Sequence, residues 1–174
     1  MVVDCAKQIR DARERVKPLW FIPYRRFYRL NPEGTYRLIA SDPAHSLQFT
    51  DPLQKSFQDT HDHGAVSSGH HWGALIQIMP REAFLAVGGM DEGFRGWGSE
   101  DVSHMYAVDT LYGRHRTYNA PVYHLWHPTT QGSYKGTKQW EDQPKTEMNN
   151  VLAAKYVRAL GNREEMRKLR GLPE

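Results

Sequence analysis

The stretch "GGMDEGFRGWGSEDVSHMY", from Gly88 to Tyr106, combines several glycines and one tryptophan with four carboxylates. Ser99 is followed by Glu100 and Asp101, an order typical of a helix start. Serine is a good N-cap residue, and the positive end of the helix dipole favours ionised carboxylates in the first turn. We therefore predict a helix from about residue 100 to residue 112, with Ser99 as its N-cap.

A large aromatic ring stands in the same stretch between two glycines. Gly96 and Gly98 flank Trp97, and a bulky ring on so permissive a backbone indicates that the ring is presented to a ligand. An aromatic face can stack on the C–H face of a sugar, while a nearby carboxylate accepts hydrogen bonds from its hydroxyls and can remove a proton from one of them. The combination favours carbohydrate as the ligand.

The rest of the chain alternates between helical and strand-like patterns, which indicates an α/β fold class. Pro18 ends the first helix, and Asn31 followed by Pro32 is typical of the start of the second. The predicted helices are 3–16, 31–40, 81–87, 100–112 and two terminal helices within about 146–174. The predicted strands are 19–23, 72–79 and 116–127, with Pro121 at an edge or bulge, and a long loop spans about 41–69.

Composition narrows the class of protein. With 174 residues and 39% hydrophobic content, the chain is long enough for one domain, which we place at 1–174. The net charge of +3 does not favour nucleic acid as a partner. Apolar runs such as Ala74–Met79 are too short for a membrane span. No export signal is visible near Asp4 and Lys7, and the lone Cys5 fits a reducing compartment, so we expect a cytoplasmic location.

The run "WGALIQIMPREAFLAVGGMDEGFRGWGSEDVS" resembles the acceptor-side segment of GT-A glycosyltransferases. The likeness is to the galactosyltransferase and polypeptide N-acetylgalactosaminyltransferase type and to bacterial family 2 relatives. Their signature is Gly-Gly-Phe-Asp-Glu followed by Trp-Gly-x-Glu-Asp, and Met90 here replaces the phenylalanine. The matching positions are Gly88, Gly89, Asp91, Glu92, Trp97, Gly98, Glu100 and Asp101. The resemblance implies the C-terminal portion of a GT-A-like nucleotide-sugar transferase fold.

The resemblance also assigns acceptor-side roles to individual residues. Asp101 matches the general base on the acceptor hydroxyl, and Glu100 matches the neighbour that binds acceptor hydroxyls. Trp97 matches the ring that stacks on the acceptor, with Gly98 beside it. Trp72 stands just before the predicted strand and either lines the acceptor cleft or packs in the core.

A divalent cation, with manganese favoured, is implied as the cofactor. In enzymes of this kind a histidine on a later strand is a metal ligand, and His124 or His127 falls at that place. Because the two are three residues apart on a predicted strand, they should face opposite sides, so at most one is expected to be the ligand, with His124 favoured. Arg25 and Arg26 could hold the diphosphate of a UDP-sugar or GDP-sugar donor.

The sequence departs from the family in one important respect, since it contains no Asp-x-Asp motif for the metal. The donor half is therefore expected on a partner chain or is missing, and open strand edges predict such a partner or a homo-oligomer. The expected function is transfer of a sugar to an acceptor hydroxyl with inversion. Two alternatives stay open: a non-catalytic sugar-binding or partner-docking module, and a metal-dependent hydrolase. The hydrolase would use the histidine-rich loop that contains His61, Asp62, His63, His70 and His71.

Overall fold

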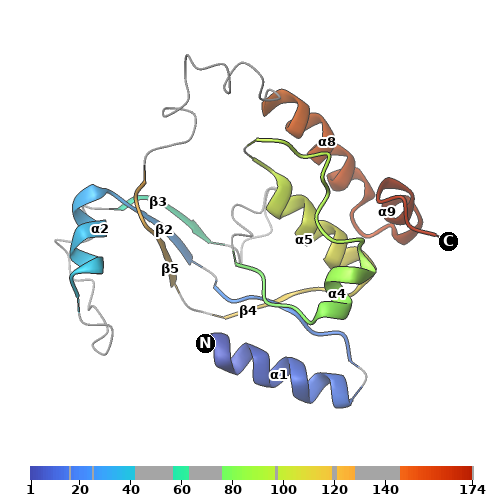
Figure 1. Ribbon diagram of the computed structural model, residues 1–174, viewed down its shortest axis with the longest axis horizontal. Helices are drawn as coiled ribbons and strands as arrows, with labels where there is room; N and C mark the ends of the chain where they lie inside the picture. Colours follow the sequence, from blue (N-terminus) through green and yellow to red (C-terminus); the bar gives the residue numbers. More distant parts are fainter. Residues whose placement is uncertain are drawn as a thin grey trace. The chain divides into compact units, whose positions relative to one another are not determined.

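A computed structural model of the chain describes residues 1–15, 17–24, 26–41, 57–62, 76–96, 98–118, 121–127 and 146–173. The chain divides into two compact units (Figure 1). Unit 1 consists of Met1–Pro23, Val66–Tyr118 and Asp142–Glu174, and unit 2 consists of Tyr24–Ala65 and Asn119–Glu141. Each unit is built from segments that are far apart in the sequence.

Most of the helices that the structure describes lie in unit 1. Its elements are α1 (Val2–Glu14), β1 (Phe21–Ile22), α4 (Arg81–Ala86), α5 (Glu100–Leu111), β4 (Arg116–Thr117), α8 (Thr146–Ala159) and α9 (Arg163–Leu169). β1 and β4 pair in parallel, and Phe21 also forms an antiparallel bridge with Ile78. This short pairing brings the segment before α4 beside the strand that follows α1.

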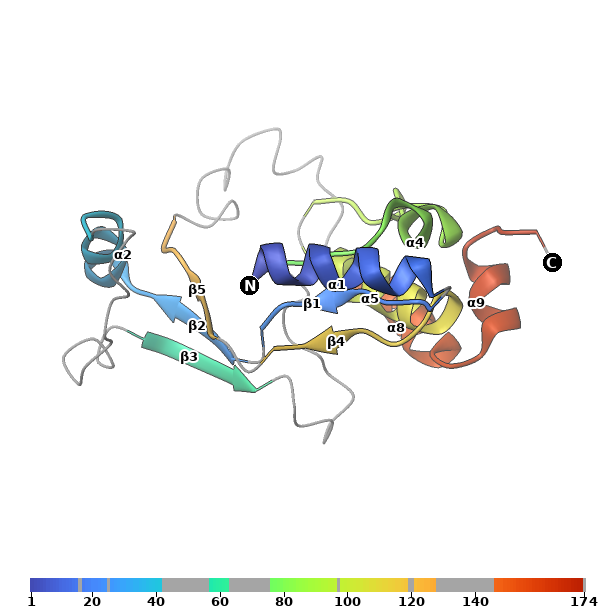
Figure 2. The ribbon, with the colours of Figure 1, turned by 90° about the horizontal axis from the view of Figure 1, so that it is seen from below.

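Helix α5 is the centre of unit 1. It contacts α4, α8 and α9, and Figure 1 shows α8 running beside it. Residues 103–108, 110 and 111 are all buried, so the helix is enclosed on nearly every side. On another part of the unit, Cys5 and Ile9 of α1 pack against Leu19 and Phe21, and Figure 2 shows α1 beside β1. Burial of these apolar side chains is the main force that holds the helices in place.

Within the residues that the structure describes, unit 2 is a small sheet with one helix. Its elements are β2 (Arg26–Leu30), α2 (Pro32–Ile39), β3 (Phe57–Asp62) and β5 (Pro121–His124). The strand order is β3-β2-β5, with β3 antiparallel and β5 parallel to β2. Pro121 begins β5 at the edge of this sheet, as predicted, because proline has no N–H to donate to a neighbouring strand and is found mainly in edge strands.

Three predicted elements differ from the structure. The loop expected at 41–69 contains β3, whose polar sequence shows no clear period but whose backbone pairs with β2. The strand expected at 72–79 has only the Ile78 bridge within its described residues, 76–79. The strand expected at 116–127 is divided into β4 and β5, because β4 pairs with β1 whereas β5 pairs with β2.

The helix predictions agree well with the structure, including the two terminal helices, which are α8 and α9. The mixture of helices and strands is consistent with an α/β domain. Among the described residues, no helix has the length and apolar character needed to cross a membrane.

Candidate functional site

The N-terminus of α5 differs from the predicted cap. Ser99 has the left-handed backbone conformation, with φ of 72°, and its side chain makes no capping hydrogen bond. The two carboxylates take over this role. Glu100 Oε2 accepts a hydrogen bond of 3.2 Å from the Gly98 amide, and Asp101 Oδ1 accepts one of 2.7 Å from the Val102 amide. Among the first-turn amides, that of Val102 is therefore satisfied by the Asp101 carboxylate rather than by the serine.

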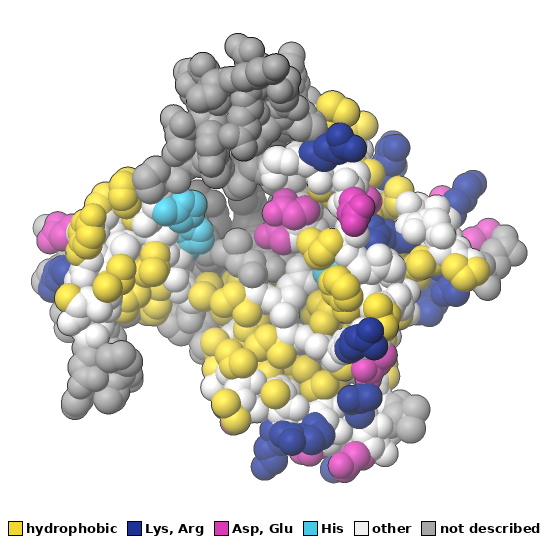
Figure 3. Space-filling model, viewed as in Figure 1, with side chains coloured by type: hydrophobic (Ala, Val, Ile, Leu, Met, Phe, Trp, Pro, Cys, Tyr) yellow, Lys and Arg dark blue, Asp and Glu magenta, His cyan; other side chains and the backbone are white. Residues whose placement is uncertain are grey.

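Asp101 is only partly exposed, and this burial changes its basicity. Desolvation raises the pKa of the Asp101 carboxyl above its ordinary value, and the neighbouring Glu100 charge acts in the same direction. A carboxylate with a raised pKa is a better proton acceptor than an ordinary aspartate. Acidic side chains are visible near the start of α5 in Figure 3. The site thus offers a base beside a second carboxylate.

Two polar side chains, those of Gln77 and His104, lie next to the backbone of Asp101. Gln77 Nε2 donates a hydrogen bond of 2.9 Å to the Asp101 carbonyl oxygen, and Gln77 Oε1 lies 2.8 Å from His104 Nδ1. His104 is 6% exposed, and burial, with a contribution from the Arg170 charge, lowers its pKa to about 4. The ring is therefore neutral near pH 7, with Nδ1 as the donor to Gln77, because an amide oxygen can only accept.

Neither Gln77 nor His104 was predicted as a site residue. The available signals were a glutamine that interrupts the apolar run at 74–79 and a histidine one helical turn after Asp101. His104 Nε2 is buried and has no hydrogen-bond partner among the described residues. The pair fixes the beginning of α5 against the segment that precedes α4.

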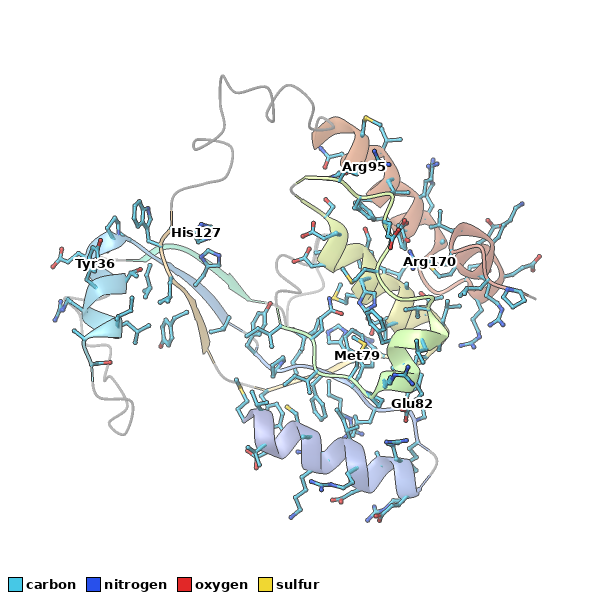
Figure 4. The ribbon with its side chains drawn as sticks, viewed as in Figure 1. Tyr36, Met79, Glu82, Arg95, His127 and Arg170 are labelled. Carbon is cyan, nitrogen blue, oxygen red and sulfur yellow. The ribbon has the colours of Figure 1, made fainter. Side chains whose placement is uncertain are left out.

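The loop between α4 and α5 is tied to α8. Asn149 of α8, which is 2% exposed, accepts a hydrogen bond from the Arg95 amide and donates one to the Arg95 carbonyl, with distances of 3.2 and 2.9 Å. Figure 4 labels Arg95 in this loop. Within the loop, the Gly93 amide donates to Asp91 Oδ1 at 2.8 Å. The segment that carries the predicted acceptor residues is thus held by a helix from the C-terminal part of the chain.

The two candidate metal ligands of unit 2 lie together. The rings of His124 and His127 have centroids 5.1 Å apart and planes inclined by 44°, and Figure 4 labels His127. The expectation that they face opposite sides was wrong, because β5 ends at His124 and the strand alternation does not extend to His127. Two adjacent imidazoles suit a divalent transition metal.

The histidine pair supplies only part of a coordination shell. Within the part of the chain that the structure describes, no group of three or more histidine, cysteine, aspartate or glutamate side chains could hold a metal ion. The remaining positions would therefore have to be filled by other ligands, such as phosphate oxygens. The two imidazoles would fit a divalent cation only as part of a larger set of ligands.

Several predicted site residues lie outside the described residues, namely Trp72, Trp97, Arg25, His63, His70 and His71. Arg26 lies in β2, opposite Pro121 of β5 and Asp62 of β3. His61 lies in β3, where its partner is Phe27. In unit 1 the structure brings together Gly98, Glu100 and Asp101, and in unit 2 it brings together His124 and His127.

Comparison with protein families gives one match. Residues 63–107 match a family described as "N-terminal domain of galactosyltransferase". The matched range includes the loop before α5 together with Glu100, Asp101, Gln77 and His104. No curated protein and no solved structure matches the chain. The similarity supports glycosyltransferase activity at a coarse level, and it falls on the segment where the carboxylates gather.

Proposed function

We propose that this chain forms the acceptor side of a glycosyltransferase of the GT-A type. It would transfer a sugar from a nucleotide-sugar donor to a hydroxyl of a carbohydrate or glycosylated acceptor. The observation that carries the proposal is a half-buried Asp101 of raised pKa at the start of α5, inside the segment that is similar to galactosyltransferases. Burial raises basicity without removing the carboxylate from the surface.

The proposed reaction is a single displacement. Asp101 takes the proton of the acceptor hydroxyl, and the oxygen attacks the anomeric carbon of the donor sugar. The bond between that carbon and the diphosphate oxygen breaks, and the diphosphate leaves with the electron pair. Because attack and departure occur on opposite sides of the carbon, the configuration is inverted.

The residues beside Asp101 would bind the acceptor. Glu100 is oriented by the hydrogen bond from the Gly98 amide and would accept hydrogen bonds from acceptor hydroxyls. Trp97 would stack on the sugar ring, and Trp72 would line the same site. Gln77 would keep the first turn of α5 in place through its bond to the Asp101 carbonyl.

The donor would be a UDP-sugar or a GDP-sugar. His124 and His127 would hold a divalent cation, with manganese favoured by the imidazole ligands. When bound, such a cation neutralises the negative charge that builds on the departing diphosphate. Arg25 and Arg26 would add charge-assisted hydrogen bonds to the same phosphates.

Replacement of the proposed base tests the function directly. We expect Asp101→Asn to lower transfer about 100- to 10,000-fold, the usual range for loss of a general base, while carbohydrate binding persists. The assay combines the chain, manganese, UDP-sugars or GDP-sugars and a panel of mono- and disaccharide acceptors. Glu92→Gln is the matched control, because Glu92 is an exposed carboxylate of the same loop. Full activity in Asp101→Asn would rule out Asp101 as the base, whereas acceptor binding without transfer in the wild type would favour a non-catalytic sugar-binding module.

The cation proposal has a separate test. Calorimetric titration with manganese in the presence of UDP or GDP should show metal-dependent nucleotide binding in the wild type. Both His124→Ala and His127→Ala should weaken it about tenfold or more, because loss of one ligand leaves the cation with a single imidazole. Unchanged manganese dependence in the double variant would exclude these histidines as ligands.

A further inference from the structure

Arg170, just after α9, makes an unusually large set of contacts with the loop that follows α4. Its Nε donates to the Val87 carbonyl at 2.9 Å, and one terminal nitrogen donates to the Gly89 carbonyl at 2.9 Å and lies 3.4 Å from the Gly88 carbonyl. The side chain is only 6% exposed. One arginine therefore contacts the carbonyl oxygens of three successive residues, and Figure 4 labels this arginine.

The same guanidinium continues into a chain of hydrogen bonds. Its other terminal nitrogen donates to the Tyr156 hydroxyl at 2.7 Å and lies 3.3 Å from Asp91 Oδ2. The Tyr156 hydroxyl in turn donates to Asp91 Oδ2 at 2.6 Å. Tyr156 of α8 is fully buried, and burial together with the Asp91 carboxylate raises its pKa, so it stays protonated as a donor. We call Arg170, Tyr156 and Asp91 the latch.

Close backbone packing accompanies the latch. A Cβ atom at Gly88 would lie 3.3 Å from the Leu172 side chain, and one at Gly93 would lie 3.2 Å from the Leu152 side chain of α8. Gly88 and Gly89 also have φ of 75°, a conformation that side chains other than glycine rarely adopt. Glycine at these positions therefore lets the loop backbone pack closely against the C-terminal part of the chain, and it does not indicate a flexible hinge.

The latch goes beyond what anchoring of α9 requires. Arg163 of the same helix donates to the Thr110 carbonyl at the far end of α5, and Asn162 caps the helix by accepting from the Glu165 amide. Arg170 instead contacts backbone carbonyls and a carboxylate that belong to the loop. That loop leads into Gly98 and Asp101. Because Arg170 holds the backbone of this loop, it also determines where Gly98 and Asp101 lie.

We propose that Arg170 is a positioning residue, which through the latch holds residues 88–96 in the conformation needed for acceptor binding. The C-terminal helices α8 and α9 are then part of the acceptor site, although they contribute no reacting group. The acceptor part of this proposal rests on the proposed function, whereas the effect on the loop does not.

The experiment compares Arg170→Gln and Tyr156→Phe with Arg163→Gln as the matched control. Amide hydrogen exchange at Gly93 and Arg95 reports the loop, and amides in the middle of α5 report global opening. We expect both latch variants to accelerate exchange in the loop about tenfold or more with little change in α5, since each removes at least one hydrogen bond to a charged group. Arg163→Gln should leave loop exchange unchanged.

Transfer kinetics supply the second readout. In the latch variants the KM for the acceptor should rise about tenfold, while the KM for the donor and kcat change less, a split that general destabilisation would not produce. Loop exchange equal to that of Arg163→Gln, or an unchanged acceptor KM, overturns the proposal. Should the wild type transfer no sugar at all, the proposed function fails by itself, and the exchange measurement still decides whether the latch controls the loop.

Discussion

Two helices of this protein begin with sequences that look equally well capped, yet the structure treats them differently. At α2, Asn31 has an extended backbone and its Oδ1 accepts a hydrogen bond of 2.8 Å from the Gly34 amide, with Pro32 in the first helical position. At α5, Ser99 is left-handed and its side chain caps nothing. One helix start follows local rules, and the other does not.

The difference continues one turn into each helix. The fifth residue of α2 is Tyr36, which is 68% exposed, whereas the fifth residue of α5 is His104, which is 6% exposed. A helix with an open face can satisfy its own end, because little else constrains it. A helix enclosed by neighbours has its start set by tertiary contacts, here with Gln77. Strained or buried polar positions of this kind are typical of functional sites.

The largest expected effect concerns the buried histidine His104, one turn into α5. The folded-state pKa of His104, about 4, lies below the ordinary value of 6.5, so the neutral ring contributes stability above pH 6.5 that is lost as pH falls through 4. From the two pKa values this contribution is about 3 kcal/mol. Urea unfolding of the wild type and His104→Gln should therefore give free energies whose difference shrinks by about that amount between pH 7 and pH 3.5.

The matching position on α2 supplies the control for this titration. Tyr36→Gln replaces an exposed residue that carries no charge across this pH range, so its difference from the wild type should stay constant. Carboxylates elsewhere titrate alike in all three proteins, and they cancel in the comparison. A constant difference for His104→Gln as well would mean that the ring is not held neutral by burial.

A smaller effect should separate the two caps themselves. Asn31→Ala removes a formed side-chain hydrogen bond and should lower the free energy of unfolding by about 1 kcal/mol. Ser99→Ala removes no capping bond and should change it by less than about 0.3 kcal/mol. Urea unfolding at pH 7 measures both. Equal losses in the two variants would contradict the distinction drawn between the helix starts.

Some features of this fold can be predicted from the sequence because they depend only on neighbouring residues. Asn31 with Pro32 predicts the start of α2, and Pro121 predicts an edge strand, because each depends on the chemistry of one or two residues. The carboxylates Glu100 and Asp101 were placed correctly in the first turn of α5 for the same reason.

The remainder depends on contacts between distant segments. The latch joins Asp91 to Arg170 and to Tyr156, which lies 65 positions later in the chain than Asp91. No local sequence pattern predicts contacts between residues so far apart. The pairing of β3 with β2 likewise overrides a sequence typical of a loop. The expectation that His124 and His127 face opposite sides was wrong because β5 ends at His124.

The smallest expected effect tests whether the start of α5 is strained. A left-handed conformation costs an L-residue about 1–2 kcal/mol, and glycine avoids this cost but loses about 1 kcal/mol through the greater freedom of its unfolded chain. Ser99→Gly should therefore raise the free energy of unfolding by about 0.5 kcal/mol, measured by urea unfolding at pH 7. Gly161→Ala is the reference, because φ there is 80° and no atom lies near an added Cβ, so its loss reports the backbone cost alone. If Ser99→Gly stabilises the fold and also slows transfer, the strain at Ser99 serves the site, because relaxing it moves Glu100 and Asp101 away from their working positions.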